Sequence, residues 1–330
     1  MALPGAHRCL TGPANQLDLL VLILSLPTQN GTARRAAIRQ SWAQPVAECS
    51  VGFAFVLGTI PPAPSVEVLP ASRAEPTSEP DAVTLPGVAE NYSTLSLKVL
   101  RALRWALDTR DFAYVLKTDD DSYVCLGGML RWLAHQQRAP GAQRLYAGRQ
   151  VGMGCVGAQH VELAAALGGE RSRRCRRGWK LPHGMPFMDG AGYILSHRLV
   201  RAVVATAERS RPPPSAEDLT VSLLLRASGE EIRAGEFGVV PFAHRRSWRS
   251  VREVLPSEGV QRRLVARRCA WSDAIVLHKL SGALVGACAR VKAETNARCA
   301  SFNGTVARQL ATRNDAGARS LAGRGVAPAA

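Results

Sequence analysis

The 330-residue sequence lacks a long apolar run. The strongest run, LLVLILSL at residues 19–26, falls far short of the roughly 20 apolar residues that a membrane-spanning helix needs. The residues before it show no succession of basic, apolar and small residues, so we identify no targeting segment. Asp18 and Pro27 flank the run, which is typical of a buried strand. With 46% hydrophobic residues, the chain can still bury a sizeable core.

The sequence also lacks any C-x-x-C pair among its eight cysteines, which argues against a zinc ribbon or a thioredoxin-type redox motif. The even count permits disulfides, but eight cysteines could pair in 105 ways and the sequence selects none of them. Three N-x-S/T sequons, at Asn30, Asn91 and Asn303, would matter only in a secretory compartment. Together they favour a lumenal protein without deciding the point.

Acidic residues and aromatic residues are scarce. The chain has 26 Asp and Glu against 42 Lys and Arg, a formal net charge of +16, and only 5% aromatic residues. Basic clusters at residues 171–180, 244–252 and 261–268 could attract nucleic acid, anionic glycans or nucleotide phosphates. With few interleaved aromatic residues they indicate nucleic acid only weakly, and an arginine-rich codon bias explains them equally well.

Strand and helix patterns alternate along the chain, which predicts an α/β domain with a mostly parallel central sheet flanked by helices. We expect a surface loop over the Pro- and Ser-rich residues 60–80. We expect one domain over residues 17–282, an N-terminal extension without a clear anchor over 1–16, and a partly disordered C-terminal extension over 283–330. The expected strands cover residues 18–26, 50–59, 112–118 and 190–196, with a brief one after residue 80, and the expected helices cover 32–42, 94–107, 126–136, 198–208 and 217–229.

Three adjacent aspartates, Asp119, Asp120 and Asp121, follow one of the expected strands. In an open α/β sheet, ligands bind at the carboxyl ends of the strands, so the aspartates stand where a site is expected. The alternating pair Asp119 and Asp121 could supply oxygen ligands to Mg²⁺ or Mn²⁺. A solvated acidic turn is the better interpretation of a bare D-x-D. An EF-hand is excluded because Tyr123 occupies a ligand position.

Several further segments accompany the aspartates in a fixed order, and with them the chain resembles the inverting β-1,3-glycosyltransferases of glycosyltransferase family 31. The resemblance spans roughly residues 17–282. Thr94 and Ser96 replace an Asn and a Thr of the family pattern. The segments that carry the resemblance are RRAAIRQSW (34–42), ENYSTLSLKVL (90–100), YVLKTDDDSYV (114–124), PFMDGAGYILS (186–196), EDLTVS (217–222) and VLHK (276–279).

The resemblance implies a GT-A fold with a D-x-D motif that binds a divalent cation, commonly Mn²⁺, with Mg²⁺ as the alternative. By the same transfer, Asp121 is a direct metal ligand, Asp119 and Asp120 hold the nucleotide-sugar and the metal shell, and His278 is a later metal ligand. Asp218 matches the catalytic base of the family. Without the resemblance, Asp218 would be interpreted as an ordinary acidic residue in the first turn of a helix. His278 would be interpreted as an ordinary histidine of a strand.

Other residues around these segments are candidate binding residues. We expect Arg35, Arg39 and Lys117 on the nucleotide side of the site. Gly190 and Gly192 would let backbone and sugar approach closely. These glycines, with Asp189 and Glu217, are placed near the donor or acceptor; taken alone, Glu217 would simply favour a helix N-terminus.

The implied activity is metal-dependent transfer of a hexose, with galactose favoured, from a UDP-sugar to a glycan or glycoprotein acceptor in β-1,3 linkage. The motif spacing leans weakly toward the type that adds galactose to the proteoglycan linkage region. N-acetylglucosaminyl transfer and an inactive sugar- or nucleotide-binding relative remain alternatives, and a nucleic-acid partner is disfavoured.

Three departures from the family pattern bear on that interpretation. Ser222 replaces a glycine, and Asp189 fills a position that is often small or apolar. Relatives are usually Golgi proteins with an N-terminal membrane anchor, which this sequence does not show, so a Golgi location and membrane association are expected by resemblance alone.

Overall fold

The computed structural model describes most of the expected catalytic domain. The described residues are 16–43, 50–59, 75–76, 79–151, 161–166, 170–171, 173, 179–180, 185–212, 216–241, 274–278, 280, 285–286 and 288–290. The three basic clusters of the sequence lie largely or wholly outside these ranges.

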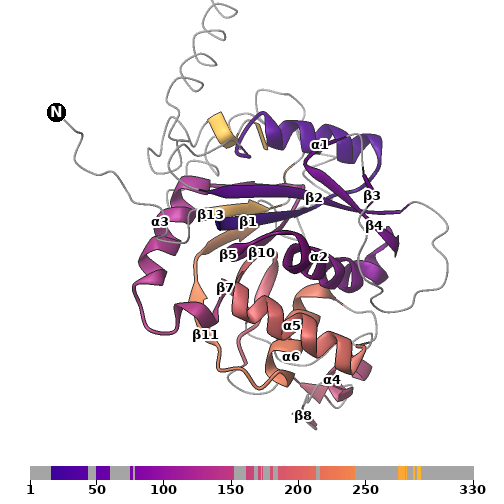
Figure 1. The fold of residues 1–330 in the computed structure, drawn as a ribbon, viewed down its shortest axis with the longest axis vertical. Helices are drawn as coiled ribbons and strands as arrows, with labels where there is room; N and C mark the ends of the chain where they lie inside the picture. The colour runs from indigo at the N-terminus through magenta and orange to yellow at the C-terminus, as the bar shows by residue number, and fades with distance from the viewer. Residues whose placement is uncertain are drawn as a thin grey trace, which may run out of the picture.

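An eight-stranded sheet forms the centre of the structure (Figure 1). Its strands lie in the order β11-β7-β10-β5-β1-β2-β4-β3. All run in one direction except β10 and β3, which are antiparallel to their neighbours. The expectation of a mostly parallel sheet is therefore confirmed. The strands are β1 (Leu17–Leu24), β2 (Val51–Thr59), β3 (Glu75–Pro76), β4 (Ala82–Ala89), β5 (Phe112–Asp119), β7 (Leu145–Gln150), β10 (Met188–Ser196) and β11 (Arg233–Glu236).

Helices cover both faces of this sheet (Figure 1). Alternate residues of β1 explain why two layers are needed: Leu20 and Leu22 belong to one buried apolar cluster, while Leu19 and Val21 belong to the other. The first cluster includes residues of α2 (Leu95–Thr109), α5 (His197–Ser210) and α6 (Glu217–Ala227). The second includes residues of α1 (Gln29–Arg39) and α3 (Leu126–Gln137). Three short helical segments are α4 (Val161–Ala166), η1 (Tyr92–Thr94) and η2 (Ala142–Arg144).

A second, three-stranded sheet brings a distant part of the chain to the aspartates. Its strands lie in the order β12-β13-β6, with β12 at Gly238–Pro241, β13 at Ala274–His278 and β6 at Ser122–Val124. Because β13 is antiparallel to β6 and pairs His278 with Ser122, the histidine arrives directly beside Asp121. The two short strands β8 (Glu170–Arg171) and β9 (Trp179–Lys180) pair only with each other.

The first helix begins three residues before the sequence predicts. Thr28 caps it, because its hydroxyl oxygen accepts a hydrogen bond from the N–H of Gly31 at 3.1 Å. A Cβ atom on Gly31 would lie 2.0 Å from the carbonyl oxygen of Leu26, so only glycine fits this turn. The turn directs the start of α1 toward the carboxyl end of β1.

The other expected helices and strands agree with the structure to within a few residues. The brief strand after residue 80 is the full-length β4, and the expected loop over 60–80 is wrong at Glu75 and Pro76, which form β3. Within the described residues, no helix is long and apolar enough to cross a membrane. The domain boundaries and the two extensions stay predictions, and in the C-terminal extension residues 285–286 and 288–290 are helical.

A buried ion pair fixes the start of α2 against the sheet. The ammonium of Lys98, with 3% of its side chain exposed, donates at 2.6 Å to the carbonyl oxygen of Ser25 and at 2.6 Å to Oε1 of Glu90. Burial is the largest influence on the pKa of Lys98 and lowers it, although Glu90 acts in the opposite direction. The contact joins the carboxyl end of β1 to the residue that follows β4.

Replacing Lys98 by methionine should destabilise the fold, because Glu90 would lose its partner while staying buried. We expect the free energy of unfolding to fall by about 3 kcal/mol in urea denaturation. Arg104→Met is the matched control on the same helix, since its pairs with Asp108 and Glu208 are all more than a third exposed and should each contribute less than about 1 kcal/mol. Equal losses in both variants would contradict this account of the buried pair.

Candidate active site

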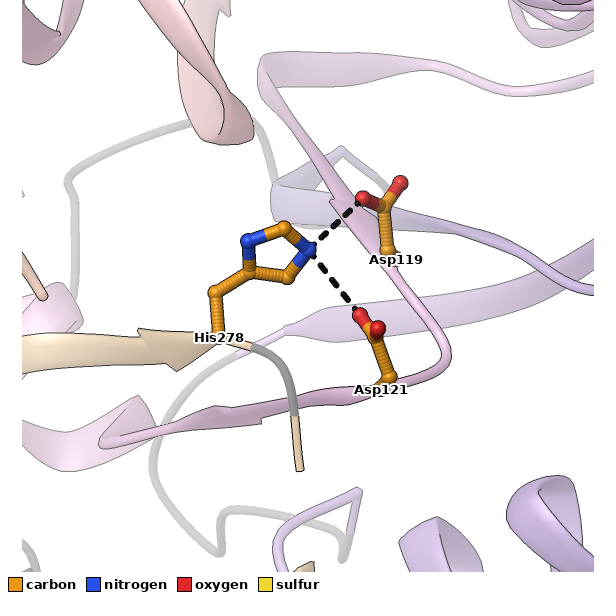
Figure 2. Close-up of side chains that lie close together, drawn as sticks. All are labelled: Asp119, Asp121 and His278. Atoms are coloured by element: carbon orange, nitrogen blue, oxygen red, sulfur yellow. Dashed lines mark ion pairs between the residues drawn. The ribbon is translucent and has the colours of Figure 1, made fainter. Parts of the chain in front are cut away.

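Asp119, Asp121 and His278 form a compact cluster at the carboxyl end of β5 (Figure 2). Nε2 of His278 lies 3.1 Å from Oδ2 of Asp119 and 3.0 Å from Oδ1 of Asp121. One potential ligand atom from each residue lies within 4.8 Å of the other two. The structure thus brings together the three residues that the sequence analysis names as metal ligands, and their role toward a metal stays a prediction.

The cluster has the donor set of a divalent cation site. Nε2 of His278 is buried, and its contacts with the two carboxylates lack the geometry of a hydrogen bond. Burial lowers the pKa of His278, but the two carboxylates outweigh it and raise the pKa to about 9. A cation that binds Nε2 of His278 would therefore have to displace a proton. Two carboxylate oxygens and one imidazole nitrogen suit a first-row divalent ion.

Asp120 lies outside this cluster. Its two carboxylate oxygens accept hydrogen bonds from the hydroxyl of Ser25 at 2.7 Å and from the guanidinium of Arg34 at 2.8 Å. Its backbone N–H donates to the carbonyl oxygen of Leu24 at 2.9 Å. Asp120 therefore ties the aspartate turn to β1 and α1. The sequence analysis overlooked Arg34, although it is the first residue of the matching segment RRAAIRQSW.

The two arginines that the sequence analysis selected on α1 face another partner. Arg35, which is 3% exposed, donates two hydrogen bonds to Glu79, at 3.0 and 2.7 Å. Arg39 pairs with both Glu79 and Asp81. The hydrogen bonds from Arg35 are the largest influence on the pKa of Glu79 and lower it to about 2. These contacts fix α1 to the start of β4, and a role for either arginine toward a nucleotide stays a prediction.

Lys117 lies inside the site rather than on its surface. Its ammonium is 2.9 Å from Oδ1 of Asp119, 2.6 Å from Oε1 of Glu217 and 2.5 Å from the carbonyl oxygen of Gly190. Only 2% of the side chain is exposed. Burial would lower the pKa of Lys117, but the two carboxylates raise it above its usual value. With three protein oxygens around three N–H donors, the geometry favours positioning of neighbouring groups over contact with a phosphate.

Glu217 and Asp218 begin α6 beside this ammonium. Burial raises the pKa of Glu217 to about 7, and the nearby Asp218 adds to the effect, although Lys117 opposes it. Oε2 of Glu217 accepts a hydrogen bond from the hydroxyl of Tyr193 at 2.8 Å. Burial also raises the pKa of Asp218, whose Oδ1 accepts from the N–H of Leu219 at 2.8 Å. Asp218 is thus a positioned carboxylate with increased basicity.

The two glycines of β10 lie close to other parts of the protein, and the expected approach of a sugar to them stays a prediction. A Cβ atom on Gly190 would lie 2.7 Å from Oε1 of Glu217 and 3.2 Å from Oδ2 of Asp218. A Cβ atom on Gly192 would lie 3.4 Å from Val276 of β13. Gly190 therefore permits the start of α6 to approach β10 closely, whereas the constraint at Gly192 is milder.

Ser222, the residue that replaces a family glycine, is accommodated by hydrogen bonds. Its side chain is buried one turn after Asp218, and its hydroxyl donates to the carbonyl oxygen of Asp218 at 2.9 Å. The hydroxyl oxygen of Tyr146 lies 2.9 Å from the hydroxyl oxygen of Ser222, within hydrogen-bond distance. The serine thus adds a tether between β7 and the first turn of α6.

Sequence comparison agrees with the geometry. The galactosyltransferase family model matches residues 33–233, which is more than half of the chain. The chain therefore belongs to the galactosyltransferase family, and the resemblance inferred from the motifs is confirmed. The match contains the three aspartates and Asp218 and ends before His278.

Curated relatives carry the corresponding names. Mouse beta-1,3-galactosyltransferase 6 is 32% identical over 205 residues, which cover 60% of this chain and 57% of the mouse protein. Human beta-1,3-galactosyltransferase 4 is 28% identical, covering 69% of this chain and 65% of the human protein. Human N-acetyllactosaminide beta-1,3-N-acetylglucosaminyltransferase 4 is 27% identical, covering 63% and 52%. The matched part of the chain thus spans about half to two thirds of the length of these relatives.

The architecture agrees with the GT-A fold that the resemblance implies. A mostly parallel sheet carries helices on both faces, and the D-x-D pair follows a central strand. The solved galactosyltransferase LgtC, in complex with donor and acceptor sugar analogs, aligns at 10% identity with a TM-score of 0.38, covering 89% of this chain and 95% of LgtC. Because that likeness is weak, the fold assignment rests on strand order, site position and family membership.

The metal cluster predicts a cation-dependent change in stability. With Mn²⁺ and UDP at about 100 times their dissociation constants, we expect stabilisation by about 3 kcal/mol, seen as a higher melting temperature. Asp121→Ala should abolish the increase, because the cation loses an oxygen ligand. Asp108→Ala removes an exposed aspartate of α2 and should keep the increase in full. If the parent melts at the same temperature with and without Mn²⁺ and UDP, the cluster is no metal site.

Glu217 predicts a pH-dependent stability in the metal-free protein. Because its pKa is raised from 4.5 to about 7, its contribution to stability is complete below pH 4.5 and is lost as the pH rises through about 7. The Glu217→Gln variant does not lose stability in this way, because glutamine does not titrate. Relative to the parent, its free energy of unfolding should therefore increase across that range by up to about 1.4 kcal/mol per pH unit. Denaturation curves at several pH values measure it, and a constant difference would refute the raised pKa.

Proposed function

We propose that this chain is an inverting, metal-dependent hexosyltransferase that moves galactose from UDP-galactose to an acceptor sugar in a β-1,3 linkage. The observation that carries the proposal is that Lys117 joins Asp119 of the Asp119, Asp121 and His278 cluster to Glu217, the neighbour of the half-buried carboxylate Asp218, in a chain of the galactosyltransferase family. The names of the curated relatives support the β-1,3 linkage.

Asp218 is the group we assign to proton transfer. An inverting transfer is a single displacement, so the acceptor hydroxyl must lose its proton as it attacks the anomeric carbon. Asp218 has the raised pKa that this task needs, and the N–H of Leu219 fixes the orientation of its carboxylate. The start of α6 is held by Lys117 through Glu217 and by the hydroxyl of Ser222.

Asp119, Asp121 and His278 would hold the divalent cation, for which we propose Mn²⁺ with Mg²⁺ as the alternative. When bound, such a cation neutralises the negative charge that develops on the departing UDP. Lys117 keeps Asp119 ionised by holding its pKa well below the usual range, against the effect of burial. The ligand carboxylate is thereby ready for a cation at neutral pH.

N-acetylglucosaminyl transfer is the second candidate function. One relative bears the name of a beta-1,3-N-acetylglucosaminyltransferase, at 27% identity compared with 32% and 28% for the two galactosyltransferases. An inactive relative is the third, and the ordered hydrogen bonds of Ser222 argue against damage at the start of α6.

We also propose a lumenal location in the Golgi apparatus and a glycan or glycoprotein acceptor. Cys125 and Cys288 are both disulfide-bonded, and disulfides persist mainly in oxidising compartments. The family membership is consistent with this location.

A panel of UDP-sugars with Mn²⁺ tests the proposed activity directly. We expect UDP release from UDP-galactose in the presence of simple galactosides or xylosides, and a β-1,3-linked product by NMR. Faster turnover of UDP-N-acetylglucosamine would favour the second candidate. No acceptor-dependent UDP release from any donor would contradict the proposed activity.

Asp218→Asn should separate binding from chemistry. The amide has the shape of the carboxylate but cannot accept the proton, so transfer should fall by about 10²–10⁴-fold. The affinity for UDP with Mn²⁺, measured by calorimetry, should stay within about twofold of the parent. If the variant transfers sugar at the parent rate, the base is another residue.

A further inference from the structure

A bulge in β10 presents Asp189 at the edge of the candidate site. The pairing of β10 with β7 is regular from Tyr193 to Leu195 and shifts between Tyr193 and Met188. Asp189 is the first residue of this irregular stretch. Its Oδ1 accepts a hydrogen bond from the N–H of Ala191 at 2.9 Å, which holds the turn in shape. The other oxygen, Oδ2, is available for a second partner.

That partner is Arg149 of β7. A guanidinium Nη2 of Arg149 contacts Oδ2 of Asp189. The side chain of Arg149 is 41% exposed and that of Asp189 is 23% exposed, so the pair reaches the surface. Nε of Arg149 is nevertheless buried and has no hydrogen-bond partner. A ligand can therefore reach the pair only through the part of the two side chains that is exposed.

The pair lies next to the groups proposed for chemistry. Gly190 follows Asp189 directly, and a Cβ atom on it would lie 3.2 Å from Oδ2 of Asp218. The negative charge of Asp189 helps to raise the pKa of Asp218. The positive charge of His278 helps to lower the pKa of Asp189. Asp189 is therefore close enough to interact electrostatically with both the proposed base and the metal cluster.

We propose that Arg149 and Asp189 form a binding pair for the hydroxyl groups of a sugar. The inference rests on the proposed function and adds specificity-determining residues to it. A sugar hydroxyl both donates and accepts hydrogen bonds, so a carboxylate and a guanidinium side by side can bind neighbouring hydroxyls. Because the two charges compensate each other, an uncharged ligand faces no net charge. The ligand is either the hexose of the donor or the acceptor sugar, since both meet near Asp218.

The test compares two conservative variants with a matched control. Asp189→Asn keeps Oδ1 as acceptor for the N–H of Ala191 but replaces Oδ2, the oxygen that faces Arg149, by an uncharged NH2 donor. Arg149→Gln removes the guanidinium. Arg198→Gln is the control, because Arg198 and Glu230 form a similar pair, 55% and 24% exposed, on a remote helix and loop. Calorimetry with Mn²⁺ gives the affinity for UDP and for UDP-galactose, and kinetics give the KM for donor and acceptor.

We expect both variants, but not the control, to lose about tenfold or more in sugar recognition while their affinity for UDP stays within twofold. A weaker affinity for UDP-galactose than in the parent identifies the donor hexose as the ligand. A raised acceptor KM with unchanged UDP-galactose affinity identifies the acceptor sugar.

The inference fails if donor affinity and both KM values stay within twofold of the parent in both variants, or if Arg198→Gln changes them equally. If the parent transfers no sugar, the proposed function fails separately. The inference is then decided by calorimetry alone, from the ratio of the affinity for UDP-galactose to the affinity for UDP. If this ratio is the same in both variants as in the parent, the inference is overturned.

Discussion

Lys117 carries a positive charge into the interior, and the candidate site is arranged around it. Its ammonium meets one oxygen each from Asp119 at the end of β5, Gly190 in the bulge of β10 and Glu217 at the start of α6. Asp119 stays ionised in this arrangement, whereas Glu217, which is buried beside Asp218, binds a proton more readily. A single buried charge thereby connects the metal-ligand strand to the helix that carries the proposed base.

The main helices and the strands β1, β2, β5 and β10 follow closely from the sequence, because buried strands and amphipathic helices leave strong local patterns. The sequence analysis did not predict β7, β11 or β12, which are short. The position of α1 shows the limit of such patterns: Thr28 and Gly31 fix its start through a cap and a tight turn, three residues before the expected start. The antiparallel direction of β10 could not be read from residues 190–196, because strand direction is set by the path of the connecting chain.

The site was predictable where the motifs name the ligands and less so where geometry decides between neighbours. The meeting of Asp119, Asp121 and His278 followed from family resemblance, since His278 arrives on β13 from more than 150 residues away. The choice between Arg34 and Arg35 had no signal in the sequence. On a helix these adjacent residues point in different directions, and the structure shows that Arg34 contacts Asp120.

The central claim is that Asp119, Asp121 and His278 together hold a divalent cation. Anomalous X-ray diffraction from crystals grown with Mn²⁺ and UDP measures this most directly. The account predicts one anomalous peak within bonding distance of Oδ2 of Asp119, Oδ1 of Asp121 and Nε2 of His278. A manganese peak elsewhere in the chain, or a well-ordered UDP with no anomalous peak beside these three side chains, would contradict it.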